Sequence, residues 1–179
     1  MGNKKKRYTI GIDIGGTKIL LAILDERFTI LSVVKMKTEI DRGASLFIKT
    51  IGKAAKKALQ DAHLRRSDIV SAGAGCPGLI DPAKGIVRFS PNIPFLKNFP
   101  LAHKLSSELG CPVKVGNDVQ TGMFGEHQLG AAKGYRHAVG IFLGTGVGGA
   151  IILNGELYGG ANGSAGEVGH LLIDPEGPL

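Results

Sequence analysis

Residues able to do chemistry gather first in the stretch Asp13–Lys18, which lies between two apolar runs. Adjacent glycines accept backbone dihedral angles that strain other residues, so two strands joined by a turn fit this pattern. Gly15 and Gly16 would expose backbone N–H groups to an anion, while Thr17 adds a hydroxyl and Lys18 a positive charge. The aspartate can hold a metal-bound water. The stretch predicts a phosphate-binding turn, although an ordinary glycine hairpin with a carboxylate at the strand end fits the same residues.

A second glycine-rich turn, Gly144–Gly149, repeats the arrangement about one domain further along the chain. Two such turns favour the phosphate interpretation, with a phosphate chain held between two lobes. Neither turn is a Walker A loop, and the strand predicted at Ala150–Leu153 excludes a dinucleotide-binding loop, which would open a helix. The predicted phosphate contacts in this second turn are Gly144, Thr145, Gly146 and Gly148.

Asp118 is the candidate catalytic residue, because it stands between a predicted strand and a predicted helix. The helix N-terminus favours the ionised carboxylate there. An ionised carboxylate can accept the proton of a substrate hydroxyl as that oxygen attacks a phosphoryl group. A simple helix N-cap fits the same position. The neighbouring Asn117 offers both a donor and an acceptor, which suits a sugar hydroxyl.

Three further polar residues have two interpretations each. Glu167 and His170 are three residues apart, so a helical turn would place them on one face. They fit hydroxyl recognition or metal ligation, or a surface capping pair. Asn92 lies between two prolines and is either a sugar-binding amide or a turn asparagine. We expect Cys76 to be a small buried hydrophobic residue.

Hydrophobic periodicity predicts a mixed α/β chain that begins with an antiparallel meander of three strands. The expected strands are Tyr8–Ile14, Ile19–Leu24, Phe28–Lys37, Ile69–Ala74, Ile86–Phe89, Pro112–Val115, His137–Leu143 and Ala150–Leu153. The expected helices are one starting at Gly43, with an apolar stripe from Phe47 to Ala62, and two more at about Pro100–Leu109 and Val119–Leu129.

Composition narrows the class of protein. Of the net charge of +7, Lys4–Arg7 contributes four charges and the remaining basic residues are scattered or lie on one helix face, which argues against a nucleic-acid partner. Cys76 and Cys111 form neither a CxxC pair nor a disulfide framework. No apolar segment is long enough to span a bilayer. We therefore expect a cytoplasmic protein with no membrane partner.

Taken together and in this order, six motifs resemble the ROK family (repressors, open reading frames and sugar kinases) of the actin-like ATPase superfamily. They are Asp13–Lys18, Gly75–Gly78, Pro91–Pro94, Gly116–Asp118, Gly144–Gly149 and Glu167–His170. The resemblance covers nearly the whole chain. It implies an actin-like (ribonuclease H-like) α/β fold with a mixed sheet and flanking helices, and transfer of the γ-phosphoryl group of ATP to a sugar hydroxyl.

The resemblance also implies roles for single residues. Asp118 becomes the general base for the 6-hydroxyl of a hexose, with glucose as the first candidate. Asp13 lies near Mg²⁺, and the two glycine turns become phosphate loops. The implied sugar-binding residues are Gly78, Asn92, Asn117, Asp118, Glu167 and His170. Residues 1–118 would form a sugar and phosphate lobe and residues 119–179 the start of a nucleotide lobe, in a possible homodimer.

Two departures from the family pattern matter. Family kinases are longer and usually carry a CxCGxxGC cluster that binds Zn²⁺ together with the histidine matching His170, whereas this chain stops at Leu179. We therefore expect an incomplete second lobe, and Zn²⁺ bound by His170 in the full-length protein. Only seven residues precede Tyr8, which argues against the DNA-binding helices of the family's repressors. A non-catalytic sugar sensor and an actin-like or chaperone-like ATPase remain alternatives.

Overall fold

The computed structural model describes residues 7–144, 146–172, 174–175 and 177. The chain divides into two compact units, Met1–Asp118 and Val119–Leu179. Among the described residues, no helix has the length and apolar character needed to cross a membrane.

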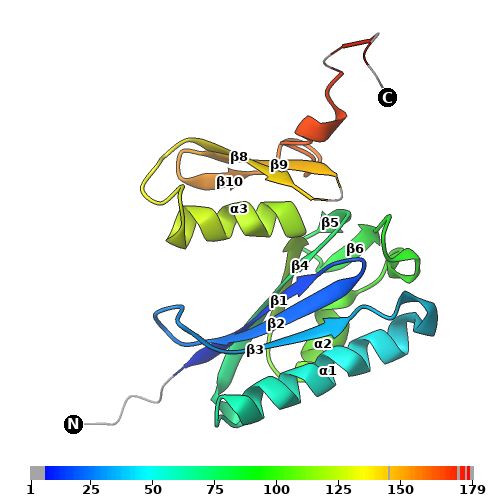
Figure 1. The fold of residues 1–179 in the computed structure, drawn as a ribbon, viewed down its shortest axis with the longest axis vertical. Helices are drawn as coiled ribbons and strands as arrows, with labels where there is room; N and C mark the ends of the chain where they lie inside the picture. Colours follow the sequence, from blue (N-terminus) through cyan, green and yellow to red (C-terminus); the bar gives the residue numbers. More distant parts are fainter. Residues whose placement is uncertain (1–6, 145, 173, 176, 178–179) are drawn as a thin grey trace. The chain divides into compact units, whose positions relative to one another are not determined.

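The first unit is built on a mixed sheet of five strands in the order β3-β2-β1-β4-β7 (Figure 1). The strands are β1 (Tyr8–Ile14), β2 (Lys18–Leu24), β3 (Ile30–Lys37), β4 (Ile69–Cys76) and β7 (Val113–Asn117). β2 is antiparallel to both β1 and β3, which confirms the predicted meander, and β4 and β7 continue the sheet parallel to β1. Three parallel carboxyl ends therefore meet at one edge of the sheet.

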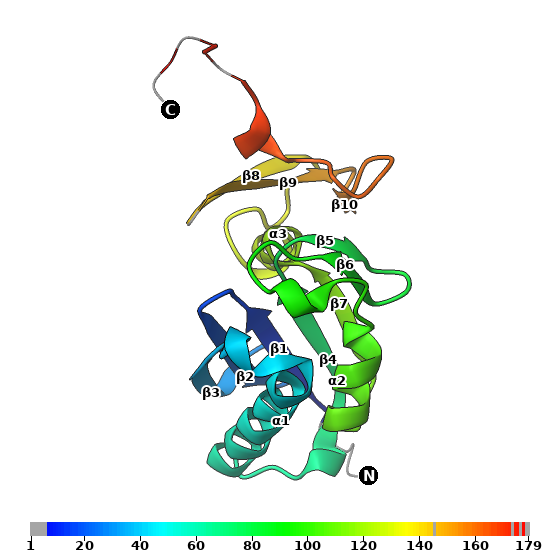
Figure 2. The same cartoon turned by 90° about the vertical axis from the view of Figure 1, so that its right-hand side faces the viewer.

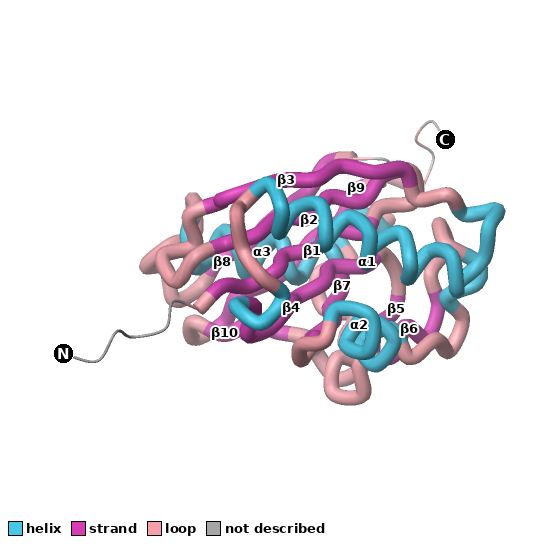
Figure 3. Tube along the Cα trace, turned by 90° about the horizontal axis from the view of Figure 1, so that it is seen from below, coloured by secondary structure: helices cyan, strands magenta, loops and turns pink. Residues whose placement is uncertain are grey.

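Two helices, α1 (Gly43–Asp61) and α2 (Leu101–Leu109), cover one face of this sheet, as Figures 2 and 3 show from two sides. The predicted stripe explains α1, because Phe47, Ile51 and Ala55 are buried while the lysines of the helix are exposed. Along β1 and β2, alternate residues point into the same core, since side chains of a strand alternate between its faces. These inward residues are Ile10, Ile12, Ile14, Ile19, Leu21 and Ile23.

Shorter elements complete the first unit. A hairpin of β5 (Leu79–Asp81) and β6 (Ile86–Phe89) follows β4, and 3₁₀ turns lie at Ile40–Arg42, Arg66–Asp68 and Pro94–Leu96. An ion pair of 2.7 Å between Arg88 Nη2 and Asp81 Oδ2 joins the two hairpin strands. This hairpin leads directly into the loop that carries Asn92.

The second unit contains a smaller sheet of three antiparallel strands in the order β10-β9-β8, and α3 packs on one of its faces. The elements are α3 (Asp118–Leu129, whose first residue belongs to the first unit), β8 (Ala138–Leu143), β9 (Val147–Leu153), β10 (Glu156–Tyr158) and a 3₁₀ turn at Val168–His170. Met123, Ala150 and Ile152 form its buried core. On the opposite face of β8, Val139, Ile141 and Leu143 are exposed.

The predicted helices and strands are all present, but the short strands β5 and β10 were not predicted and several strand ends differ by up to three residues. One of these differences changes the candidate site. The return strand of the second glycine turn begins at Val147 rather than Ala150, so the loop itself is only Gly144–Gly146. Gly148 therefore lies inside β9. A Cβ built on Gly148 would lie 2.6 Å from Val119 Cγ2, so the close approach of a side chain from α3 accounts for this glycine.

Candidate functional site

The carboxyl ends of β1, β4 and β7 bring chemistry-bearing residues of the first unit to one edge of the sheet. In register, Asp13 lies level with Gly75 on β4, which lies level with Gly116 on β7. With strands about 4.8 Å apart, the Cα atoms of Asp13 and Gly116 are separated by about 10 Å. Asp13 is exposed, on the face opposite the helices, and the two glycines place no side chain beside it. The edge thus places one exposed carboxylate level with two glycines.

The first glycine turn joins β1 to β2 through Gly15, Gly16 and Thr17. The turn offers fewer free N–H donors than the sequence predicted, because the Gly15 N–H donates to the Lys18 carbonyl at 2.9 Å. A Cβ on Gly15 would also lie 2.9 Å from that carbonyl oxygen. The tight turn therefore requires glycine at this position, and Gly15 contributes shape rather than an anion-binding N–H.

Asn92 lies against this turn. A Cβ built on Gly16 would stand 2.9 Å from Asn92 Cβ, so the turn and the Asn92 loop are in direct contact and leave no room for a side chain at Gly16. The side chains of Ile93 and Leu96 anchor the loop, because both are buried in the core of the first unit. The structure thus places a predicted sugar-binding residue beside a predicted phosphate turn.

Gly78 connects the same loop to the end of β7. Its φ of +110° and the overlap that a Cβ would make with the Phe89 carbonyl oxygen both require glycine. Asn117 Nδ2 donates to the Gly78 carbonyl at 3.2 Å. This bond fixes the Asn117 amide at the start of α3, next to Asp118. Gly78, Asn92, Asn117 and the first turn are therefore linked through consecutive contacts.

Asp118 is the first residue of α3 and directly follows β7, as predicted. Its carboxylate lies close enough to Cys76 to act on that thiol: burial first, and the negative charge of Asp118 second, raise the pKa of Cys76 to about 12. Cys76 is completely buried. It is thus a small hydrophobic residue under the candidate base rather than a nucleophile, which confirms the prediction for it.

The second unit holds the other predicted residues. The 3₁₀ turn brings Glu167 Oε2 to within 3.8 Å of His170 Nε2, so these two side chains face one another as their spacing predicted. Both are exposed. Close backbone contacts between Gly149 and Gly166 hold this segment against β9. Gly144 and Gly146 lie in the open loop beside Val147, and Thr145 lies outside the described residues.

One residue that positions the first turn was missed from the sequence. Thr38, directly after β3, is 2% exposed, and its hydroxyl donates to the Gly15 carbonyl at 2.7 Å. No local pattern marks it, because its partner lies 23 residues earlier in the chain. The sequence shows only a threonine directly after the predicted strand Phe28–Lys37.

Two of the predicted site residues, Asp13 and His170, are candidate metal ligands. The exposed Asp13 carboxylate suits a hydrated Mg²⁺, which prefers oxygen ligands and keeps several waters. Within the described ranges, no group of three or more His, Cys, Asp and Glu side chains is placed to hold a metal ion. The described residues around His170 therefore do not make a Zn²⁺ site, and we route no chemistry through zinc.

Several known sugar kinases are similar to this chain. The glucokinase of Halalkalibacterium halodurans is 39% identical over 171 residues, which is 96% of this chain and 52% of that protein. The N-acetylgalactosamine kinase AgaK of Shewanella sp. is 38% identical over 160 residues, 89% of this chain and 50% of that protein. A crystal structure of a ROK family glucokinase from Streptomyces griseus in complex with glucose and AMPPNP matches with a TM-score of 0.82 and 37% identity over 96% of this chain and 53% of that one.

The chain spans about half the length of the curated relatives it matches. Its mixed sheet with flanking helices is the actin-like ATPase fold of these sugar kinases. The family model for ROK matches residues 9–179. This chain therefore belongs to the ROK family.

Proposed function

We propose that the protein containing this chain is an ATP-dependent sugar kinase that phosphorylates a hexose, with glucose as its first substrate and the 6-hydroxyl as the acceptor. The observation that carries the proposal is the connected cluster in the first unit. It joins a glycine turn, an amide packed on that turn and a carboxylate at a helix start. Phosphoryl transfer needs an anion cradle, hydroxyl recognition and a base.

Asp118 would act as the general base. As the sugar oxygen attacks the γ-phosphorus, the hydroxyl proton passes to the Asp118 carboxylate, the bond to the β-γ bridging oxygen breaks, and ADP leaves. Its place at the start of α3 favours the ionised form that this role needs. Asn117, fixed by its bond to Gly78, would orient the attacking sugar.

The phosphates are assigned to the two glycine turns, at Gly15–Lys18 and Gly144–Gly146. In the first turn the N–H of Gly16, the hydroxyl of Thr17 and the ammonium of Lys18 would contact the anion. Asp13 would hold a water of Mg²⁺, and that ion would offset the negative charge on the phosphates. Gly148 as a phosphate contact stays a prediction.

The remaining sugar contacts are assigned to Gly78, Asn92, Glu167 and His170. Glu167 and His170 support the assignment because a carboxylate and an imidazole 3.8 Å apart can bond to neighbouring hydroxyls of one ring. Zinc binding by His170, a homodimer and a cytoplasmic location stay predictions.

The test is release of ADP in the presence of ATP and Mg²⁺ across a panel of hexoses and N-acetylhexosamines, using the full-length protein and the 179-residue chain in parallel. We expect sugar-dependent release, largest with glucose. The panel includes N-acetylgalactosamine because a relative named for that substrate is almost as similar as the glucokinase.

Each contrary outcome names a different function. ATP turnover that no sugar changes would replace the kinase with an ATPase of the same fold. Sugar binding by calorimetry without any phosphoryl transfer in the full-length protein would replace it with a sugar sensor. Preference for an N-acetylhexosamine would keep the kinase and overturn glucose as its substrate, since one hydrogen bond can separate such substrates.

A further inference from the structure

Thr38 makes two hydrogen bonds to the first glycine turn although it lies outside that turn. Its hydroxyl donates to the Gly15 carbonyl at 2.7 Å, and its backbone N–H donates to the Thr17 carbonyl at 3.1 Å. The residue is 2% exposed. Both ends of the loop Gly15–Thr17 are therefore held by one buried residue at the end of β3.

These bonds orient the peptide groups of the loop. In a planar trans peptide, the C=O of one residue and the N–H of the next point in opposite directions. Because the Gly15 carbonyl points to Thr38, the Gly16 N–H points away from Thr38. The Gly15 N–H is itself used by Lys18. The orientation of the Gly16 donor thus depends on the hydroxyl of Thr38.

We propose that Thr38 is the positioning residue of the phosphate turn, acting on ATP only through the peptide groups it holds. The proposal rests on the proposed kinase function for the identity of the ligand. Valine has nearly the shape of threonine but no hydroxyl, so Thr38→Val would leave the partly buried Gly15 carbonyl without this donor. The peptide between Gly15 and Gly16 would then be free to rotate, and the turn would bind phosphate less well.

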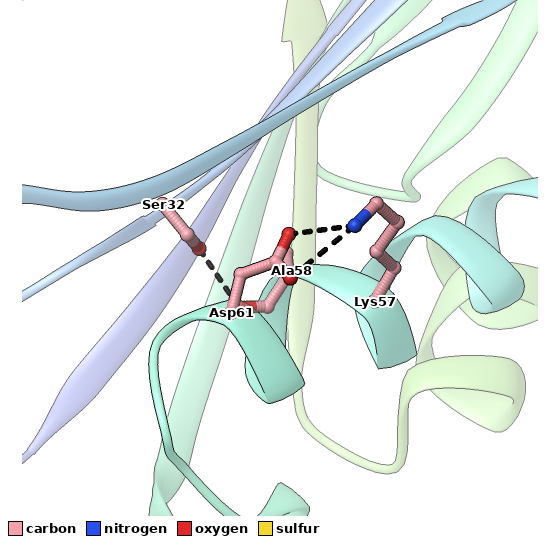
Figure 4. A network of polar contacts seen from close by, with 4 residues as sticks. All are labelled: Ser32, Lys57, Ala58 and Asp61. Carbon is pink, nitrogen blue, oxygen red and sulfur yellow. Dashed lines mark hydrogen bonds and ion pairs between the residues drawn. The ribbon is translucent and has the colours of Figure 1, made fainter.

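Ser32 supplies a matched control on β3, the strand that Thr38 directly follows (Figure 4). Its hydroxyl donates to the Ala58 carbonyl of α1 at 2.8 Å, beside the ion pair of Lys57 and Asp61. Six residues of strand, about 20 Å, separate Ser32 from Thr38. Ser32→Ala therefore removes a hydrogen bond from a hydroxyl to a backbone carbonyl, as Thr38→Val does, but at a distance from the glycine turn.

The experiment uses the full-length protein with Thr38→Val, Thr38→Ser and Ser32→Ala. For each we would measure the KM values for ATP and sugar, kcat, the Kd of a non-hydrolysable ATP analogue and the thermal midpoint. We expect Thr38→Val to raise the KM for ATP and the analogue Kd about tenfold while the sugar KM changes less than about twofold. Thr38→Ser should restore both constants, and Ser32→Ala should lower only the thermal midpoint.

An analogue Kd unchanged in Thr38→Val, or raised as much in Ser32→Ala, would overturn the proposal. If Thr38→Val does not fold, Thr38→Ala is used for the same comparison. If the wild type binds the analogue but phosphorylates no sugar, the kinase function fails while the Kd values still decide the role of Thr38. If the wild type does not bind the analogue, both proposals fail.

Discussion

The chain contains two meanders of the same design, β1-β2-β3 in the first unit and β8-β9-β10 in the second. Each first strand turns back through a three-residue loop that begins with glycine. The loops are nevertheless supported differently. In the first, a Cβ at Gly16 would lie 2.9 Å from Asn92, whereas in the second a Cβ at Gly144 or Gly146 would meet no described atom within 4 Å.

This difference indicates why the two turns contain glycine. Packing against Asn92 accounts for Gly16. Packing among the described residues accounts for neither Gly144 nor Gly146, and Gly144 has no left-handed φ. The Gly144 N–H donates to the Gly146 carbonyl at 2.9 Å, as the Gly15 N–H does to Lys18 in the first turn. The phosphate that we propose for the second turn would account for Gly146, because an anion bound to its backbone N–H leaves no space for a side chain. Gly146 is thus the turn glycine that depends most on the ligand.

The largest effect on stability is expected where β9 meets the segment that carries Glu167 and His170. Gly166 has a φ of +92°, and a Cβ there would lie 2.6 Å from the Gly149 carbonyl oxygen. Gly166→Ala should therefore destabilise the second unit by about 3 kcal/mol and raise the sugar KM. Hydrogen exchange of the β8 and β9 amides, together with sugar kinetics, would measure both.

Gly163→Ala is the control for that variant. Gly163 also has a positive φ, of +79°, but no described atom within 4 Å of a built Cβ. Gly163→Ala should therefore lower the free energy of unfolding only by the cost of backbone strain at this φ, about 1 kcal/mol. Equal losses in the two variants would show that contact between Gly149 and Gly166 does not hold the segment in place.

A matched pair of turn variants tests the comparison itself. Gly16→Ala should displace Asn92 and lower the free energy of unfolding by about 1–2 kcal/mol. Gly146→Ala should change that free energy by less than about 0.5 kcal/mol and still raise the KM for ATP. Urea denaturation and ATP kinetics would measure these effects. A Gly146→Ala protein with an unchanged KM for ATP would remove the second turn from the phosphate site.

The sequence predicted element types well because apolar spacing determines them, as along α1 and β1. It also placed Asp118 correctly at the boundary of β7 and α3. It did not predict how the turns are supported. Thr38 and the Gly16 contact with Asn92 join segments that lie far apart in the chain, and the length of the second loop depends on how far pairing of β9 with β8 continues.

The smallest effect is expected at the hairpin that leads into the Asn92 loop. The hydrogen bond from Arg88 is the largest cause that lowers the pKa of Asp81 below its ordinary 3.8. Because this pKa is lowered on folding, the resulting stabilisation is present above pH 3.8 and is lost as the pH falls through the lower, folded value. Arg88→Ala should shift the midpoint of acid unfolding of the first unit slightly upward, as measured by circular dichroism. An unchanged midpoint would mean that the ion pair adds nothing to the support of the loop.

The most direct test of the central claim is Asp118→Asn in the full-length protein, with kcat measured by ADP release and sugar affinity by calorimetry. The amide keeps the shape of the carboxylate but cannot accept the hydroxyl proton. We predict that kcat falls by about a thousandfold while the sugar Kd stays within about threefold of the wild type. A variant that turns over at a near-normal rate would contradict the account, because Asp118 could not then be the base.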